Sequence, residues 1–253
     1  MAISRKPFQG VFNIIKFNWH FYLLSFALIV LMLFASFFIP VFYPYVITAS
    51  VIIALLSIIS LLVSFYVYDV SSLYQLKWFN KFNEGKPVTI LNINAGFDET
   101  SELLQVKFKK AALVIFDFYD VEKHTEISIK RARKAYPPHP YSITVNTNNL
   151  PLENNSIDFA IAILSAHEIR DERERITFFE GLNRIIKPEG YIFITEHLRD
   201  LSNLLAYNIG FLHFHSRATW IRTFTKAGLK IVEEEKTTPF ITTFILQRHD
   251  HTH

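Results

Sequence analysis

Residues able to bind a ligand or move a proton stand directly after short apolar runs in the second half of the chain. Gly96 follows the first of these runs, Asp117 ends the second, and His167 follows a later one. A glycine lets the backbone approach a ligand closely, a carboxylate accepts hydrogen bonds from paired hydroxyls, and an imidazole exchanges a proton near neutral pH. This pattern predicts a site in which Asp117 holds a ribose and His167 moves a proton.

Strands alternating with helices would bring these residues together. The apolar runs predict strands at residues 88–93, 112–116, 141–145, 158–164 and 191–195. Helices are predicted at residues 102–110, 122–135, 171–186 and 216–227, with a turn at 187–190 and a final strand pair at 230–235 and 240–246. Nearly continuous apolar strands of this kind indicate a mainly parallel sheet covered on both faces. Ligands bind beyond the carboxyl ends of such strands, where the residues above would lie.

Three segments resemble class I S-adenosylmethionine-dependent methyltransferases. They are NNLPLENNSID (148–158), GLNRIIKPEGYIFITE (181–196) and HFHSRATWIRTFTKAGLKIVEEE (213–235). The resemblance covers roughly residues 86–247. It implies an α/β, Rossmann-like domain with a mainly parallel seven-stranded sheet and an antiparallel edge strand. It also implies S-adenosylmethionine as the cofactor.

The resemblance assigns roles to particular residues. Asn92, Asn94 and Gly96 occupy the place of the family's glycine-rich motif, Asp117 that of the ribose-binding acid, and Asn146 and Thr147 that of the adenine-reading segment. His167 is the first candidate catalytic base and Glu168 the second, with His197, His213 and His215 behind them. No metal ligand set is expected, because no carboxylate lies close in sequence to His213 and His215. The family's glycines are replaced at Asn94 and Asp98.

The N-terminal part of the chain is strongly apolar. No Asp, Glu, Lys or Arg occurs between Phe17 and Tyr68. Two apolar runs, about 21–39 and 46–68, are separated by a segment with prolines at 40 and 44, and each is long enough to cross a bilayer. A transmembrane helical hairpin is therefore predicted. A cleaved signal peptide is disfavoured because a second run follows directly, and a buried soluble hairpin would normally show a polar face.

The charges flanking the hairpin predict its orientation. Three basic residues precede it (Arg5, Lys6 and Lys16), three follow it (Lys77, Lys81 and Lys86), and the connecting turn has no charge. By the positive-inside rule, both termini and the soluble domain are cytoplasmic, on the inner membrane if the protein is bacterial. The expected organisation is a basic N-terminus (1–20), the hairpin (21–68), a helical connector (69–86), the methyltransferase-like domain (87–248) and a histidine-containing tail (249–253).

Composition narrows the possible functions. The net charge is only +3 and no basic patch is interleaved with aromatic residues, so nucleic acid is not expected as a partner. The chain has no cysteine, which excludes thiolate metal sites and disulfides. Because no charged residue lies in the middle of the predicted membrane segments, the hairpin is predicted to be an anchor rather than a channel.

The main interpretation is therefore a membrane-anchored methyltransferase, with the bilayer and a small lipophilic acceptor as partners. A binding or scaffold protein that has lost the cofactor is the first alternative, and the altered glycine-rich motif motivates it. A reductase using another nucleotide is the second, although a pyrophosphate needs closer backbone approach than the altered motif offers.

Overall fold

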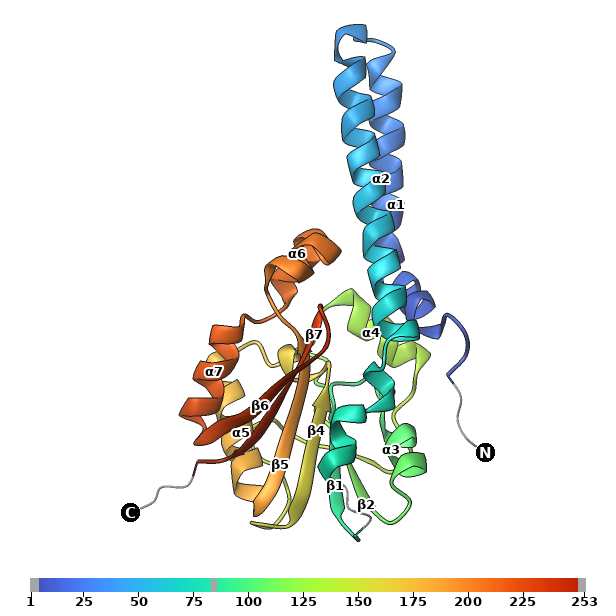
Figure 1. Ribbon diagram of the computed structural model, residues 1–253. Helices are drawn as coiled ribbons and strands as arrows, with labels where there is room; N and C mark the ends of the chain where they lie inside the picture. Colours follow the sequence, from blue (N-terminus) through green and yellow to red (C-terminus); the bar gives the residue numbers. More distant parts are fainter. Residues whose placement is uncertain (1–4, 83–85, 250–253) are drawn as a thin grey trace.

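The computed structural model describes residues 5–82 and 86–249. Two long helices, α1 (Gln9–Ser36) and α2 (Tyr43–Phe65), rise side by side from an α/β domain, joined by a 3₁₀ turn at Pro40–Phe42 (Figure 1). Both are long and apolar enough to cross a membrane, and only 6% of the most apolar window of each is buried. The core helix of a soluble protein would be mostly buried.

The helix boundaries differ from those predicted. α1 begins at Gln9, twelve residues before the apolar run, and it is kinked at Asn18, where φ is −117° and ψ is 17°. α2 begins at Tyr43 and places Pro44 in its first turn, where the missing N–H has no helical partner to lose. The apolar runs mark the segments of membrane length, whereas the helices extend beyond them.

The connector is not the continuous helix predicted. A π-helical turn at Tyr66–Val70 ends α2, and 3₁₀ turns follow at Leu73–Gln75 and Lys77–Phe82. Trp78 and Phe79 are buried against one face of the sheet, each with its ring centroid 5.0 Å from that of Phe193. Apolar side chains of the connector therefore form part of the domain core, and a regular helix would not place them all on the sheet.

The predicted sheet is confirmed. Its seven strands have the order β3-β2-β1-β4-β5-β7-β6. They are β1 (Thr89–Asn94), β2 (Ala112–Asp117), β3 (Ser142–Thr144), β4 (Ile157–Ile163), β5 (Ile186–His197), β6 (Leu229–Thr238) and β7 (Ile241–Arg248). The first five are parallel, and β7 runs antiparallel between β5 and β6.

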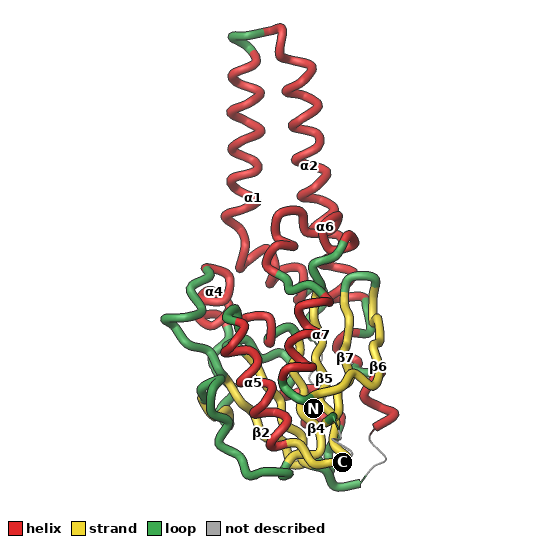
Figure 2. The backbone as a smooth tube through the Cα atoms, turned by 90° about the vertical axis from the view of Figure 1, so that its left-hand side faces the viewer, coloured by secondary structure: helices red, strands yellow, loops and turns green. Residues whose placement is uncertain are grey.

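Helices cover the sheet on both faces. They are α3 (Ser101–Lys107), α5 (Glu172–Ile185) and α7 (Arg217–Lys226). By contrast, α4 (Ile127–Ala135) packs on α1 and α6 (Leu201–Tyr207) packs on α2, beyond the strand ends that face the hairpin (Figure 1). Figure 2 shows α5 and α7 side by side against one face. The other face packs on α3 and the connector. Two local predictions were wrong: α4 starts at Ile127 rather than at 122, and β5 runs through the predicted turn at 187–190 because Ile186 pairs with Ile157.

The base of the hairpin packs on the edge of the sheet formed by the carboxyl ends of the parallel strands. Phe17 of α1 lies edge-on to Phe97, which follows β1, with 5.5 Å between ring centroids. The hydroxyl of Tyr68 lies 2.8 Å from Nε2 of His197, the last residue of β5. The hairpin therefore stands over the edge at which the sequence predicts the site.

Candidate active site

The loop after β1 is closed by side chains of its own. Gly96 has φ +93°, a conformation that favours glycine. The side chain of Asn94 accepts from the Gly96 N–H at 3.0 Å and donates to the Phe116 carbonyl at 3.2 Å. Asn94 thus fixes the turn through hydrogen bonds, at a position where the family has a glycine.

The start of α3 holds the other side of this loop. Asn92 is fully buried, and its amide donates to the hydroxyls of Thr100 at 2.9 Å and Ser101 at 2.8 Å. Oδ1 of Asp98 accepts from the backbone N–H groups of the same two residues at 3.0 and 2.9 Å. Asn92 therefore positions the loop. Oδ2 of Asp98 is buried, and none of the described residues donates a hydrogen bond to it.

Asp117 ends β2 close to Gly96, as predicted. Its carboxylate is 1% exposed, and Oδ1 accepts from the Tyr119 N–H at 3.0 Å. Oδ2 accepts from Nη1 of Arg133 on α4, whose guanidinium also lies 5.3 Å from the Tyr119 ring centroid. Tyr119 packs on Gly96 so closely that a Cβ there would lie 2.8–2.9 Å from it. Asp117 therefore has an internal cationic partner.

A cavity of about 410 Å³ opens beyond the ends of β2 and β3. Its lining residues are Phe118, Tyr119, Asp120, Val121, Lys123, His124, Thr144, Val145, Asn146, Thr147 and Glu174. The Thr147 hydroxyl donates to Glu174, which also pairs with Lys123 at 2.7 Å. The volume lies in the range of small-molecule sites, and aromatic faces and polar edges both line it.

His167 follows β4 in a 3₁₀ turn, Ala166–Glu168. Its backbone N–H donates to Oε1 of the fully buried Glu196 at 3.1 Å, and its Nδ1 lies 2.6 Å from Oε2 of the same carboxylate. The other ring nitrogen, Nε2, faces Oε1 of Glu168 at 3.5 Å. Glu196 therefore fixes both the backbone and the ring of His167.

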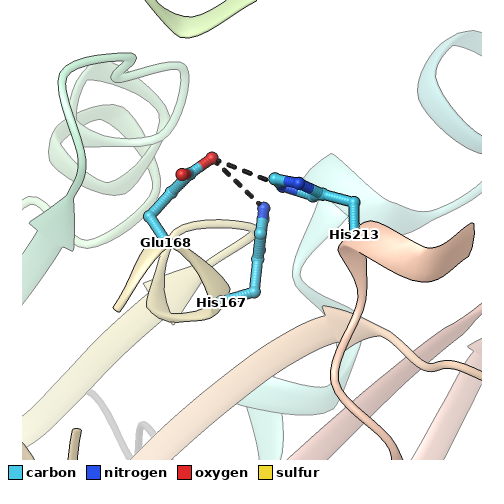
Figure 3. Close-up of side chains that lie close together, drawn as sticks. All are labelled: His167, Glu168 and His213. Atoms are coloured by element: carbon cyan, nitrogen blue, oxygen red, sulfur yellow. Dashed lines mark ion pairs between the residues drawn. The ribbon is translucent and has the colours of Figure 1, made fainter. Parts of the chain in front are cut away.

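His213 completes a cluster with His167 and Glu168 (Figure 3). It comes from the 3₁₀ segment Asn208–His213, and its Nε2 lies 3.6 Å from Oε1 of Glu168. Its Nδ1 lies 2.8 Å from Oε1 of Glu126, the residue before α4. Nη2 of Arg170 lies 2.8 Å from Nε2 of His213. The cluster therefore joins two chain segments that are distant in sequence, and Glu126 adds a contact from a third.

A family model described as a methyltransferase domain matches residues 81–194, from the connector through most of β5. The match and the strand order agree with the resemblance found in the sequence. The chain carries a class I S-adenosylmethionine-dependent methyltransferase domain. No curated protein sequence matches the chain.

Solved structures share the fold of the methyltransferase domain. A S-adenosylmethionine-dependent methyltransferase from Clostridium acetobutylicum aligns with a TM-score of 0.52 and 11% identity, over 73% of this chain and 94% of that one. One from Aquifex aeolicus gives a TM-score of 0.48 and 17% identity, over 76% and 97%. One from Methanosarcina mazei gives 0.47 and 17%, over 64% and 92%.

The methyltransferase cofactor, S-adenosylmethionine, fits the residues present. The buried, unpartnered Oδ2 of Asp98 is an acceptor that a cationic ligand group would satisfy. Asp117 stands at the second strand end, and the cavity next to it has room and aromatic faces for a base. Arg133 already pairs with Oδ2 of Asp117, an oxygen that a ribose hydroxyl would need.

The charge state of His167 is set by its two carboxylate neighbours. Burial of the ring opposes protonation, but the charges and hydrogen bonds of Glu196 and Glu168 raise the pKa of His167 to about 10. Burial likewise opposes ionisation of Glu168, yet His167 and His213 hold the pKa of its carboxyl well below the usual range. The cluster therefore pairs the imidazolium of His167 with the carboxylate of Glu168.

Two other predicted histidines lie outside this cluster. Burial lowers the pKa of His197 to about 4, and its Nδ1 lies 3.0 Å from Oδ1 of Asn203. Burial also lowers the pKa of His215 to about 3, and its Nε2 lies 3.2 Å from Nη1 of Arg175. Both rings are therefore neutral at pH 7 and bonded to neighbouring elements.

The sequence reading missed Arg133, Tyr119 and Glu196. Arg133 lies in a polar segment whose composition is typical of a solvent-exposed helix. Nothing in the sequence therefore predicts its ion pair with Asp117. Glu196 directly follows the predicted strand at 191–195, at a strand end where ligands are expected, but its sequence position alone predicts no contact with His167. Of the histidine-containing tail predicted at 249–253, residues 250–253 lie outside the described residues.

Proposed function

We propose that the protein is a membrane-anchored methyltransferase acting on a small lipophilic acceptor. The observation that carries the proposal is the position of the apolar hairpin over the carboxyl ends of the strands, through Phe17 on Phe97 and Tyr68 on His197. The candidate site then opens toward the bilayer surface. An anchor serving only to tether the domain would not need to pack on this edge.

Cofactor binding would use four positions. Asp117 would accept from the ribose hydroxyls, Thr147 and Asn146 would face the adenine, and Asp98 would accept from the methionine ammonium. When bound, S-adenosylmethionine supplies an electrophilic methyl carbon. Arg133 competes with the ribose for Asp117, so it must release Oδ2 before the site is filled.

Exposed apolar side chains offer a path for a lipophilic acceptor. They belong to α6 and the 3₁₀ segment after it: Leu201, Leu204, Leu205, Ile209 and Leu212. α6 stands beside the base of α2 (Figure 1), and the 3₁₀ segment ends at His213. An amphipathic acceptor could thus keep its apolar part against this surface and present its polar end to the cluster.

Methyl transfer demands little chemistry from the protein. It needs alignment of the two reactants and, for an oxygen nucleophile, removal of a proton. The assignment of His167 as that base remains a prediction. At a pKa of about 10 the ring already holds a proton at neutral pH, so it can accept one only after its own proton is displaced.

We place both ends of the hairpin and the domain on the cytoplasmic face. The basic residues before α1 and after α2 support this orientation. Reporter fusions at residue 42 and after residue 85 test it. An external signal at 42 with an internal one after 85 is expected, and an external signal after 85 would contradict it.

A binding or scaffold protein is the second candidate function. The pairing of Arg133 with Asp117, and the packing of Tyr119 on Gly96, are the observations that favour it. Calorimetric titration of the full chain with S-adenosylmethionine and S-adenosylhomocysteine separates the two. The methyltransferase binds both ligands, and the scaffold binds neither.

A further inference from the structure

We propose that His167, Glu168 and His213 form a binding site for a divalent transition-metal cation, for which Zn²⁺ is the best-suited ion. One ligand atom from each residue lies within 4.8 Å of the others (Figure 3). Two imidazoles with one carboxylate are a ligand set that Zn²⁺ accepts in catalytic sites, where a further position stays open for water or substrate.

The distances suit such an ion. Oε1 of Glu168 lies 3.5 Å from Nε2 of His167 and 3.6 Å from Nε2 of His213. Ligand atoms about 2.1 Å from a tetrahedral Zn²⁺ lie about 3.4 Å apart. Both of these separations are close to that value, and no two of the three ligand atoms are more than 4.8 Å apart, so a small approach of the side chains would let them share one ion.

Both histidines are oriented as metal ligands usually are. Nδ1 of His167 lies 2.6 Å from Glu196, and Nδ1 of His213 lies 2.8 Å from Glu126. In each ring a carboxylate contacts Nδ1 and Nε2 faces Glu168; in His213 both ring nitrogens also contact Nη2 of Arg170, which an ion would have to displace. A ligating histidine typically donates its other N–H to a carboxylate or carbonyl, which fixes the tautomer and aims the coordinating nitrogen.

The charges around the site favour a cation. Glu126, Glu168 and Glu196 bring three carboxylates to two imidazoles. Arg170 supplies the opposing charge, with Nη2 2.8 Å from Nε2 of His213. Its side chain is 40% exposed, so it can turn toward solvent when an ion takes its place.

The position of the site suggests what the ion would bind. The cluster lies just beyond β4 and at the end of the exposed apolar surface of α6 and its following segment. This step rests on the function proposed above: the open coordination position of the ion would bind an oxygen atom of the methyl acceptor. Metal binding itself requires neither the cofactor nor the acceptor.

The test uses the full chain in detergent, stripped with a chelator and titrated with Co²⁺ and with Zn²⁺. His251 and His253 are replaced by alanine in every protein compared, because the tail could chelate metal by itself. One equivalent of Co²⁺ is expected, with the visible absorption of a low-symmetry nitrogen and oxygen site, and Zn²⁺ should displace it.

Variants then locate the ion. Glu168→Gln and His213→Ala should each weaken Co²⁺ binding by about 10-fold or more, whereas His139→Ala, outside the cluster, should leave it unchanged. Arg170→Gln should tighten binding about threefold or more, because it removes a competing cation. No stoichiometric binding by the parent chain, or binding that survives both cluster variants, would overturn the proposal. These titrations contain no cofactor, so their result does not depend on whether the protein transfers a methyl group.

Discussion

The hydroxyl of Tyr68 lies 2.8 Å from Nε2 of His197 and joins the end of the second apolar helix to the end of β5. Nδ1 of the same ring lies 3.0 Å from both Oδ1 of Asn203 and the Phe240 carbonyl. The ring therefore donates through Nδ1 and accepts from the phenol through Nε2. This arrangement requires a neutral imidazole.

Acid should weaken the fold through His197. Burial lowers its pKa from 6.5 to about 4, so between these values the unfolded chain binds a proton that the folded chain does not. The contribution is fully present above pH 6.5 and falls as the pH drops toward 4, by up to about 3 kcal/mol. Thermal unfolding of the detergent-solubilised chain from pH 7 to 4 measures it.

A variant isolates this effect from other titrating groups. His197→Gln should lose less stability than the wild type over the same pH interval, whatever its stability at pH 7. Parallel declines in the two proteins would show that His197 is not the titrating group.

Cofactor affinity should respond in opposite directions to the two partners of the Asp117–Arg133 pair. Asp117→Ala should weaken S-adenosylmethionine binding by about 1.5–3 kcal/mol, the range for a hydrogen bond to a charged group. Arg133→Ala should strengthen it by about 1 kcal/mol, since the pair is partly exposed and the competing donor is gone. Lys134→Ala, on an exposed position of the same helix, serves as the control.

The double variant shows whether the two effects share one cause. If Arg133 acts by occupying Asp117, adding Arg133→Ala to Asp117→Ala should bring no further gain in affinity. A gain of the same size in both backgrounds would refute competition for the carboxylate.

Replacing His167 should lower turnover but leave cofactor binding nearly unchanged. His167→Ala should lower the rate of methyl transfer by about 10² to 10⁴, the usual cost of removing an acid–base group, while the dissociation constant of S-adenosylmethionine stays nearly unchanged. Rate assays and calorimetry on the same preparation give both values, with His139→Ala as control. Equal losses of binding and rate would instead make His167 a support for the cofactor loop.

Asp69 should stabilise the base of the hairpin, because its side chain caps the N-terminus of α1 from a position distant in sequence. Its two carboxylate oxygens accept from the N–H groups of Gly10 at 2.7 Å and Val11 at 2.8 Å, in the first turn of α1. Asp69→Ala should cost about 1 kcal/mol, or roughly 2–4 °C in the unfolding midpoint. An unchanged midpoint, equal to that of the exposed-site control Glu102→Ala, would argue against the cap.

Much of the fold could be predicted because its signals are local. Apolar runs of strand length gave six of the seven strands nearly at their bounds, and Ser216 caps α7 as its position suggests. The placement of Asp117 beside Gly96 followed from parallel strands whose ends share one edge. Signals of this kind depend on neighbours in sequence.

The remainder depends on contacts that sequence spacing does not encode. His213 reaches Glu168 from an irregular apolar segment without periodicity, so its partner could not be inferred. The helical arm of α1 before Asn18 owes its position to distant groups, including the Tyr136 hydroxyl that donates to Asn13 at 2.8 Å. β5 continues through a turn-like sequence because pairing with β4 outweighs the local preference.

The central claim is that this domain, with its altered glycine-rich loop, binds S-adenosylmethionine at the edge of the sheet beneath the hairpin. Calorimetric titration of the full chain in lipid nanodiscs tests it most directly, with S-adenosylhomocysteine as second ligand and Asp117→Ala as the matched variant. The account predicts saturable one-site binding of both ligands by the wild type and clear weakening in the variant. Absence of saturable binding by a folded wild-type chain, or equal affinity in Asp117→Ala, would contradict it.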